Sequence, residues 1–380
     1  MILIKQASIY APAFQGVQDV LLGGETILLM GETIELNHPD VMVIDGAGKR
    51  LVPGLIDQHV HITGGGGEGS FKTRVPEITL SKLVEAGITT VVGLLGTDAS
   101  TRSVENLVAK AKALKEEGIT AYAHTGSYEY PSVTLTGSVR KDIVFIEEII
   151  GGKVALSDHR SSSLTPAELA RLASDVRTAG MLSGKAGALI AHMGSGRRGM
   201  GMIREVLENT DIPITTIRPT HVNRAENLLQ ESLLFAKDGG IIDITCGTYQ
   251  EWPAHRVIQM AREQQVPLEN ITISSDGYGS WSTYDEKGVM LKIGVSQVSS
   301  FWESLRHMVM EETFTLEEAL PFFTSHVAKA LCLQQKGRVA VGADADLLLV
   351  NSEMELESVI ARGRLMMHEG NCLVKGTYEV

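Results

Sequence analysis

The chain has 380 residues, of which 43% are hydrophobic and 21% charged, an ordinary balance for a globular protein. Its formal net charge of −12 disfavours binding to nucleic-acid phosphates or anionic lipid, so neither is an expected partner. The widely spaced Cys246, Cys332 and Cys372 indicate neither a disulfide framework nor a thiolate metal site. With no signal peptide and no apolar run of membrane-spanning length, we expect a soluble cytoplasmic protein.

Both ends of the chain consist of short segments typical of β-strands separated by turns. Residues 2–10 alternate between apolar and polar side chains, and glycines divide residues 20–36 into hairpin-like segments. The same pattern returns over residues 345–380. We therefore predict one small β-sandwich-like domain formed by residues 1–54 together with residues 338–380.

The middle of the chain, residues 55–337, alternates short apolar segments with amphipathic ones. In residues 165–180, for example, an apolar stripe follows Thr165, a suitable N-cap before Pro166. Repeated βα units predict parallel strands and an α/β fold, here a TIM-like (β/α)8 barrel. A dinucleotide-binding sheet is the rival, but no G-x-G-x-x-G follows the first strand, which also argues against a nicotinamide-dependent oxidoreductase. The eight predicted strands lie at 55–62, 89–95, 120–126, 153–158, 188–193, 217–222, 241–247 and 271–276.

Candidate metal ligands stand where these predicted strands end. His59 and His61 are two residues apart, so in a strand both imidazoles project from one face. His192, His221 and Asp276 each end another apolar segment. In a barrel the carboxyl ends of the strands converge on one face, and imidazole with carboxylate is a donor set that zinc accepts. The pattern therefore predicts a metal site.

Lys153 stands at the start of the predicted fourth strand, and two interpretations remain open. It can be a surface lysine whose stem lies along apolar neighbours. Alternatively, burial can depress its pKa, so that the neutral amine reacts with carbon dioxide to form a carbamate that bridges two cations.

Several longer motifs point to a known family. The segments DQHVHI and GADADLLLV resemble the amidohydrolase superfamily, and the chain as a whole is similar to the isoaspartyl (β-aspartyl) dipeptidases within it. The motifs that carry the narrower resemblance run in order along the chain: HVHITGGGGEG, VVGLLGTD, TGSYEYPSVTLTGSVRKD, KVALSDHRSS, HMGSG, PTHVNR and SSDGYGS.

The resemblance implies a distorted (β/α)8 barrel with a small β-domain and two Zn²⁺ ions, bridged by hydroxide and a carboxylated lysine. His59, His61 and Asp276 match the ligands of one zinc ion, His192 and His221 match those of the other, and Lys153 matches the bridging residue. All six positions hold the expected residue type, which argues against a non-catalytic scaffold that has lost its metals.

The resemblance also implies a metalloprotease of the dipeptidase class, acting on a small dipeptide that carries a free amine and two carboxylates. Glu68 matches the residue that binds the substrate amine, whereas Arg160, Arg224 and Ser280 match carboxylate-binding positions. Gly66 and Thr97 are further candidates for the pocket lining.

Tyr128 and Asp276 match the residues that act on the scissile amide. We expect Tyr128, rather than the neighbouring Tyr130, to stabilise the oxyanion that develops as the bridging hydroxide attacks the carbonyl. Asp276 would pass the hydroxide proton to the leaving amine.

A cyclic amidase of the dihydroorotase or dihydropyrimidinase type is the main alternative, because it would use the same metal ligands. Glu68 argues against it, since a cyclic imide has no free amine to bind. The family resemblance further implies a homo-oligomer.

Overall fold

The computed structural model describes residues 1–379 and contains an eight-stranded parallel sheet in which the strand order follows the chain order. A parallel bridge between Val60 and Gly277, with the His61 amide donating to the Gly277 carbonyl at 2.9 Å, joins the two edges of this sheet. The sheet confirms the predicted α/β class with parallel strands. Its strands are β6 (Leu55–Val60), β7 (Ile88–Gly93), β8 (Thr120–Gly126), β9 (Ile149–Leu156), β10 (Ala188–Met193), β11 (Ile217–Thr220), β12 (Ile242–Thr245) and β13 (Ile271–Ser274).

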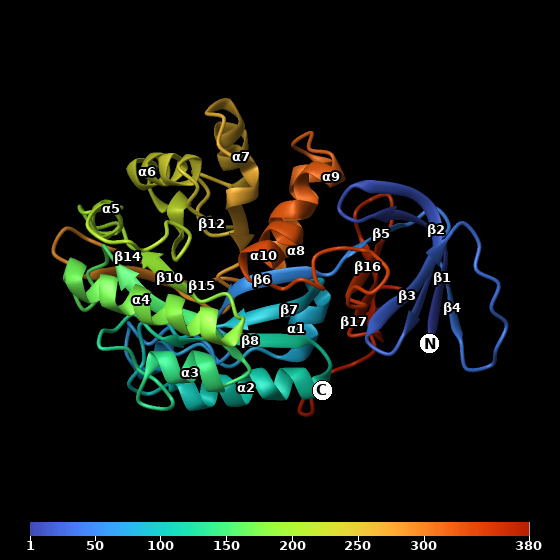
Figure 1. Ribbon diagram of the computed structural model, residues 1–380, viewed down its shortest axis with the longest axis horizontal. Coiled ribbons are helices and arrows are strands. Elements are labelled where there is room, and N and C mark those ends of the chain that lie inside the picture. The colour runs from blue at the N-terminus through green and yellow to red at the C-terminus, as the bar shows by residue number, and fades with distance from the viewer. Residues whose placement is uncertain (380) are drawn as a thin grey trace.

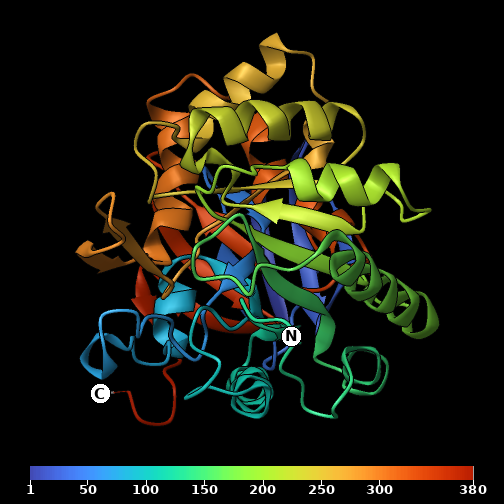
Figure 2. The same ribbon diagram turned by 90° about the vertical axis from the view of Figure 1, so that its left-hand side faces the viewer.

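Helices lie around the outside of these strands, as Figure 2 shows. In the helix at 166–183 the Thr165 hydroxyl accepts from the Glu168 amide while the Glu168 carboxylate accepts from the Thr165 amide, a capping box. Its predicted stripe, including Leu169, Leu172 and Val176, is buried. The helices are α1 (Leu80–Glu85), α2 (Val104–Glu117), α3 (Val139–Phe145), α4 (Pro166–Ser183), α5 (Gly201–Glu208), α6 (Glu226–Lys237), α7 (Ala254–Glu263), α8 (Ser299–Met310), α9 (Leu316–Ala319) and α10 (Ser325–Ala330).

Strand β9 differs from the sequence prediction, because it begins at Ile149 and places Lys153 in its interior. Gly151 and Gly152, which precede the predicted strand, lie within β9. A Cβ on Gly151 would stand 2.3 Å from the Ala188 carbonyl oxygen, so the glycine is needed for close strand packing rather than for a turn. As a result Lys153 is fully buried, which excludes the surface interpretation.

Strands from both chain ends form a second, nine-stranded sheet, drawn in dark blue and red on the right of Figure 1. Its order is β19-β18-β17-β16-β5-β1-β2-β3, with β4 paired to β1. The antiparallel pairing of β5 with β16 joins the N-terminal and C-terminal strands. The strands are β1 (Ile2–Tyr10), β2 (Phe14–Gly23), β3 (Thr26–Gly31), β4 (Met42–Asp45), β5 (Arg50–Pro53), β16 (Leu347–Val350), β17 (Leu356–Ala361), β18 (Arg364–His368) and β19 (Asn371–Cys372).

An antiparallel hairpin of β14 (Ser280–Tyr284) and β15 (Met290–Val295) separates β13 from α8. It belongs to neither large sheet. None of the helices formed by residues 1–379 combines the length and apolar character needed to cross a membrane.

Candidate metal centre and substrate pocket

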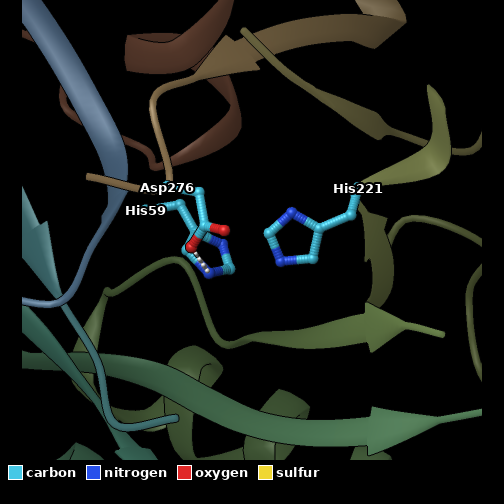
Figure 3. Close-up of side chains that lie close together, drawn as sticks. All are labelled: His59, His221 and Asp276. Carbon is cyan, nitrogen blue, oxygen red and sulfur yellow. Dashed lines mark ion pairs between the residues drawn. The ribbon is translucent and has the colours of Figure 1, made fainter. Parts of the chain in front are cut away.

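His59, His61 and Asp276 meet at the seam where β6 faces the end of β13. The Asp276 Oδ1 atom lies 3.6 Å from His59 Nε2 and 3.3 Å from His61 Nε2. Figure 3 shows the carboxylate against His59, with the ring of His221 facing both. Donor atoms of His59, His221 and Asp276 lie within 4.8 Å of one another, so these three side chains can hold one cation.

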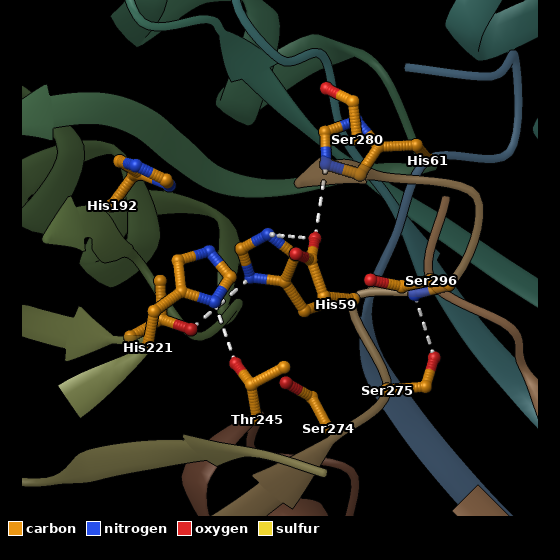
Figure 4. A network of polar contacts seen from close by, with 12 residues as sticks. His59, His61, His192, His221, Thr245, Ser274, Ser275, Ser280 and Ser296 are labelled. Carbon is orange, nitrogen blue, oxygen red and sulfur yellow. Dashed lines mark hydrogen bonds and ion pairs between the residues drawn. The ribbon is translucent and has the colours of Figure 1, made fainter. Parts of the chain in front are cut away.

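His221, just after β11, and His192, near the end of β10, continue the cluster. The His221 ring centroid lies 4.7 Å from that of His59 and 4.7 Å from that of His192 (Figure 4). His221 Nδ1 lies 2.6 Å from the Thr245 hydroxyl, which leaves Nε2 for another partner. Such a hydrogen bond fixes the ring orientation, as the outer contacts of metal-binding histidines do.

Lys153 reaches the same cluster from β9. Its Nζ lies 2.9 Å from His59 Nε2, and the side chain has essentially no solvent exposure. Burial lowers the pKa of Lys153 to about 7, so a large fraction of the amine is neutral near neutral pH. The structure therefore brings together all six residues predicted as ligands.

The backbone at the cluster is strained and closely packed. His221 and Asp276 both occupy the left-handed region, with φ of 61° and 53°, which residues other than glycine rarely adopt. A Cβ on Gly279 would stand 2.5 Å from Asp276 Oδ1, and one on Gly96 would stand 2.9 Å from His61 Cε1. Only glycine at these two positions lets the chain pass so close to the His61 and Asp276 side chains.

The protonation states and free valences of the cluster suit divalent cations. Burial, reinforced by neighbouring positive charge, holds the pKa values of His59, His192 and His221 well below their usual range, so the rings are neutral and keep a lone pair. Within residues 1–379, Asp276 Oδ1 is buried without a hydrogen-bond donor. Neutral imidazoles and a carboxylate that lacks a donor form the set that zinc prefers.

Tyr128 lies against the cluster beside His192. Its hydroxyl is 2.6 Å from His192 Nδ1, while His192 Nε2 lies 3.0 Å from the Asp158 carboxylate. The two contacts fit a tautomer in which Nε2–H donates to Asp158, so the Nδ1 lone pair, which faces the Tyr128 hydroxyl, is the one that a cation would take. Burial raises the pKa of Tyr128 well above its usual value, so the phenol stays protonated and able to donate.

Glu68 is the centre of a second polar group. Its Oε1 accepts from Ser280 at 2.7 Å, Arg160 at 3.1 Å and Thr97 at 3.2 Å, so three predicted pocket residues converge on one oxygen. The Glu68 side chain is only 6% exposed, and its Oε2 is buried with no hydrogen-bond partner in the described chain. A buried carboxylate oxygen without a donor is costly unless something completes it.

Asp158 connects the two groups, although the sequence analysis did not single it out. It binds Arg160 through two parallel hydrogen bonds of 2.9 and 2.8 Å and lies 3.7 Å from Arg224. Burial raises the pKa of Asp158, but hydrogen bonds from Arg160 and His192 outweigh it, and the pKa falls well below the usual range. Arg224 also donates to the Tyr249 hydroxyl at 2.8 Å.

A cavity of about 480 Å³, the size of a site for a small molecule, lies beside the Asp158–Arg160 pair. Asp158, Arg160 and Arg224 line one part of it, and residues 280–285, which include β14, line another. Gly66, Glu68, Thr97 and Tyr128 are not among its lining residues, although Glu68 contacts two that are, Arg160 and Ser280. Gly66 pairs with Arg74 across its own loop, and a Cβ there would stand 2.3 Å from the Thr73 carbonyl oxygen.

Comparison with known proteins identifies the family, because the amidohydrolase family model matches residues 50–366. The chain belongs to the amidohydrolase family. It is therefore an enzyme, a hydrolase. A β-aspartyl dipeptidase from Fervidobacterium islandicum, solved in complex with the dipeptide β-Asp-Leu, is 44% identical with a TM-score of 0.92, and the alignment covers 98% of both chains.

Dihydroorotases of the amidohydrolase family are more distant. Those of Streptococcus pyogenes are 30% identical over 164 residues, which is 42% of this chain and 35% of theirs, so the match spans about a third of their length. The dihydroorotase of Geobacillus thermodenitrificans is 24% identical over 371 residues, 85% of this chain and 82% of the relative.

Arg102 was also missed by the sequence analysis, and it holds the glycine-rich loop that carries Glu68. This arginine is 7% exposed and donates to three carbonyl oxygens of the loop, those of Thr63, Gly65 at 3.0 Å and Val75 at 2.8 Å. Burial lowers its pKa from the usual value. In the sequence it is a lone arginine 34 residues after Glu68, with no local signal of this contact.

Proposed function

We propose that this amidohydrolase is a dinuclear zinc dipeptidase that cleaves the β-linked peptide bond of isoaspartyl dipeptides. The observation that carries the proposal is the buried, unpaired Oε2 of Glu68, beside the His–Asp cluster. An ammonium group is the natural partner for a desolvated carboxylate oxygen, and an isoaspartyl dipeptide presents a free α-amine. The dipeptidase of Fervidobacterium islandicum, 44% identical over nearly the whole chain, supports the same substrate class.

The remaining pocket charges suit the two carboxylates of such a dipeptide. Arg160 and Arg224 each offer a planar guanidinium at the cavity wall, and Ser280 offers a hydroxyl. Arg160 is already paired with Asp158 and Glu68, so the substrate would replace the Glu68–Arg160 contact with its own amine and carboxylate. Each buried charge would then keep a partner of opposite sign.

The metal set would comprise two zinc ions, with Lys153 as a carboxylated bridging residue and the remaining ligands as assigned by the family resemblance. Two divalent cations bound there would polarise the scissile carbonyl and lower the pKa of a water molecule. Burial of Lys153 beside His59 supports its carboxylation, because within residues 1–379 no carboxylate lies within hydrogen-bond distance of Nζ to keep the amine charged. We further infer that residues 55–337 form a closed (β/α)8 barrel, which the Val60–Gly277 bridge supports.

Two residues of this chain would act on the reacting atoms. Tyr128, kept protonated by burial, would donate its hydroxyl proton in a hydrogen bond to the developing oxyanion. Asp276, whose Oδ1 has no hydrogen-bond donor, would take a proton from the attacking water and deliver it to the leaving amine.

A cyclic amidase is the second candidate, and the similarity to dihydroorotases over most of the chain favours it. It would use the same His–Asp–Lys cluster. The two candidates differ at Glu68, since a cyclic amide leaves the Oε2 atom without an ammonium partner.

The test compares substrates that differ only in linkage or in the free amine. We expect β-Asp-Leu to be cleaved, and α-Asp-Leu, N-acetyl-β-Asp-Leu, dihydroorotate and dihydrouracil to be inert, with at least two metal ions per chain by elemental analysis. Cleavage of dihydroorotate with β-Asp-Leu untouched would establish the cyclic amidase instead. Equal cleavage of the acetylated dipeptide would remove Glu68 from amine recognition.

The substitution Glu68→Gln also tests whether Glu68 binds the substrate amine, since glutamine retains an oxygen for Ser280 and Thr97 but loses the charge. We expect kcat/KM on β-Asp-Leu to fall about 100-fold, the cost of leaving a buried ammonium without its counter-charge. The matched control is Glu77→Gln, an exposed glutamate of the same chain segment, and its kcat/KM is expected to stay within twofold of the parent.

A further inference from the structure

A second group of side chains that can act as metal ligands lies outside the parallel sheet, on α7, on α8 and just after α8. Donor atoms of His255, His307 and Glu312 lie within 4.8 Å of one another. Glu312 Oε1 is 3.2 Å from His307 Nε2 and 3.6 Å from His255 Nε2, so both imidazoles aim the same ring nitrogen at one carboxylate oxygen. The two ring centroids are 5.1 Å apart.

The backbone beneath these side chains is held by packing on both helices. His255 lies in the first turn of α7, whose residues Val257 and Ile258 are fully buried. His307 lies in the last turn of α8, whose inner face buries Leu305 and Met308. The two histidines are therefore presented by anchored elements rather than by free loops.

The group is open enough for a cation to enter. The side chains of His255, His307 and Glu312 are 18%, 39% and 31% exposed. Glu311 adds a second carboxylate, with its Oε2 atom 3.1 Å from His307 Nδ1. Two imidazoles and one carboxylate make the three-ligand set of many zinc sites, in which water fills the fourth position.

We propose that His255, His307 and Glu312 form a peripheral zinc site that links the start of α7 to the end of α8. It is separate from the His59–Asp276 cluster and does not depend on the proposed dipeptidase activity. The bound cation would take the place of the proton that a His–Glu ion pair needs, and it would hold the three side chains in one geometry.

The simpler alternative is a set of proton-mediated ion pairs, in which His307 bridges Glu311 and Glu312 and no metal binds. The two cases differ in metal content at neutral pH. Ion pairs would stabilise the protein most when the histidines are protonated, whereas zinc binding requires neutral imidazoles and weakens as pH falls.

The experiment measures metal content after equilibrium dialysis of the whole protein against micromolar ZnCl₂. We expect the double variant His255→Gln/His307→Gln to hold one equivalent of zinc fewer than the parent. His38→Gln is the matched control, because His38 is an exposed histidine that pairs with Asp40 at 3.6 Å but has no second imidazole. Its zinc content should equal that of the parent.

A second readout uses Co²⁺, whose visible absorption reports tetrahedral coordination. The parent should bind an additional equivalent of Co²⁺ that is lost in the double variant, while the hydrolytic activity of the two proteins stays within twofold. Equal zinc content in parent and double variant, with superimposable Co²⁺ spectra, would overturn the site. Because the comparison is a difference of one equivalent, its outcome is independent of whether β-Asp-Leu is a substrate.

Discussion

Buried carboxylates near the parallel sheet and in the sheet formed by the chain ends differ in whether both oxygens accept hydrogen bonds. At the ends of the parallel strands, Asp276 Oδ1 and Glu68 Oε2 are buried and have no hydrogen-bond partner in the described chain. In the sheet formed by the chain ends, Asp19 is equally buried, but its oxygens accept from the Gln6 amide at 2.8 Å, the Ile34 amide at 2.8 Å and Lys5 at 2.6 Å. The carboxylates of Asp276 and Glu68 each keep one oxygen free for a partner, whereas both oxygens of Asp19 accept hydrogen bonds.

This difference in hydrogen bonding indicates which carboxylates can bind a ligand and which ones stabilise the fold. A satisfied carboxylate has nothing left to offer a ligand, whereas an unsatisfied one destabilises the fold until something binds. The left-handed backbone at His221 and Asp276 adds local strain to the same region. Substitutions at the ends of the parallel strands should therefore reduce activity more than stability, and those at Asp19 should do the reverse.

Asp276→Asn should show the largest effect on activity. Asparagine keeps the size of the side chain but cannot accept the proton, so we expect kcat on β-Asp-Leu to fall about 1,000-fold, within the range for loss of a general acid–base. The melting temperature should change by only a few degrees, since Oδ1 accepts no hydrogen bond to lose. Steady-state kinetics, thermal unfolding and metal analysis on one preparation check both halves.

Asp238→Asn, at an exposed position after α6, is the control and should match the parent in both measurements. If Asp276→Asn retained more than a tenth of the parental kcat, Asp276 would not be the proton carrier. If it retained kcat but had a much lower melting temperature, Asp276 would stabilise the fold rather than act on the substrate.

Arg102→Gln should have the next largest effect, although Arg102 is a positioning residue that acts through the Glu68 loop. Without its hydrogen bonds to Thr63, Gly65 and Val75, Glu68 should lose its fixed position. We expect kcat/KM to fall about 10- to 100-fold, mainly through KM, because small displacements of a binding group are costly.

Arg102→Lys should recover part of this loss, since an ammonium can donate to some of the same carbonyl oxygens. Arg140→Gln, which removes an exposed arginine paired with Asp175, should leave KM unchanged. An effect of Arg102→Gln on kcat alone, with KM as in the parent, would show that the loop does not position Glu68.

Periodicity was enough to predict the parts of the site that lie on regular strands. His59, His192, His221 and Asp276 end apolar segments, and the geometry of parallel strands brings such ends together. His124 shows the limit of this reasoning, since it also lies near the end of a strand. In the structure it packs beside Gly151, 2.8 Å from where a Cβ would stand, and it is not one of the three residues that can hold one cation, His59, His221 and Asp276.

Contacts made across loops had no sequence signal. Asp158 and Arg102 bind residues whose positions depend on loop conformations, and no periodicity fixes these. The burial of Lys153 was equally undetermined, because the sequence does not show that the strand extends back through Gly151 and Gly152 to Ile149. The pairing of His255 with His307 depends on how two helices pack, which helix periodicity alone does not specify.

Asp19→Asn completes the comparison with the smallest effect on activity. Burial raises the pKa of Asp19, but the hydrogen bonds from Lys5, Ile34 and Gln6 outweigh it and hold the pKa below the usual 3.8. A carboxylate with a depressed folded-state pKa stabilises the protein above the unfolded-state pKa, and the contribution is lost as pH falls through the folded-state value. At pH 7 we expect Asp19→Asn to lower the free energy of unfolding by about 1–3 kcal/mol in urea, with kcat/KM within twofold of the parent. Below a pH of about 4 the difference between the two proteins should shrink.

Asp40→Asn, at an exposed carboxylate, should change the unfolding free energy by less than about 0.5 kcal/mol at either pH. A pH-independent loss in Asp19→Asn would mean that its hydrogen bonds stabilise the sheet without its charge, and Lys5 would then contribute nothing to the pairing of β1 with β2.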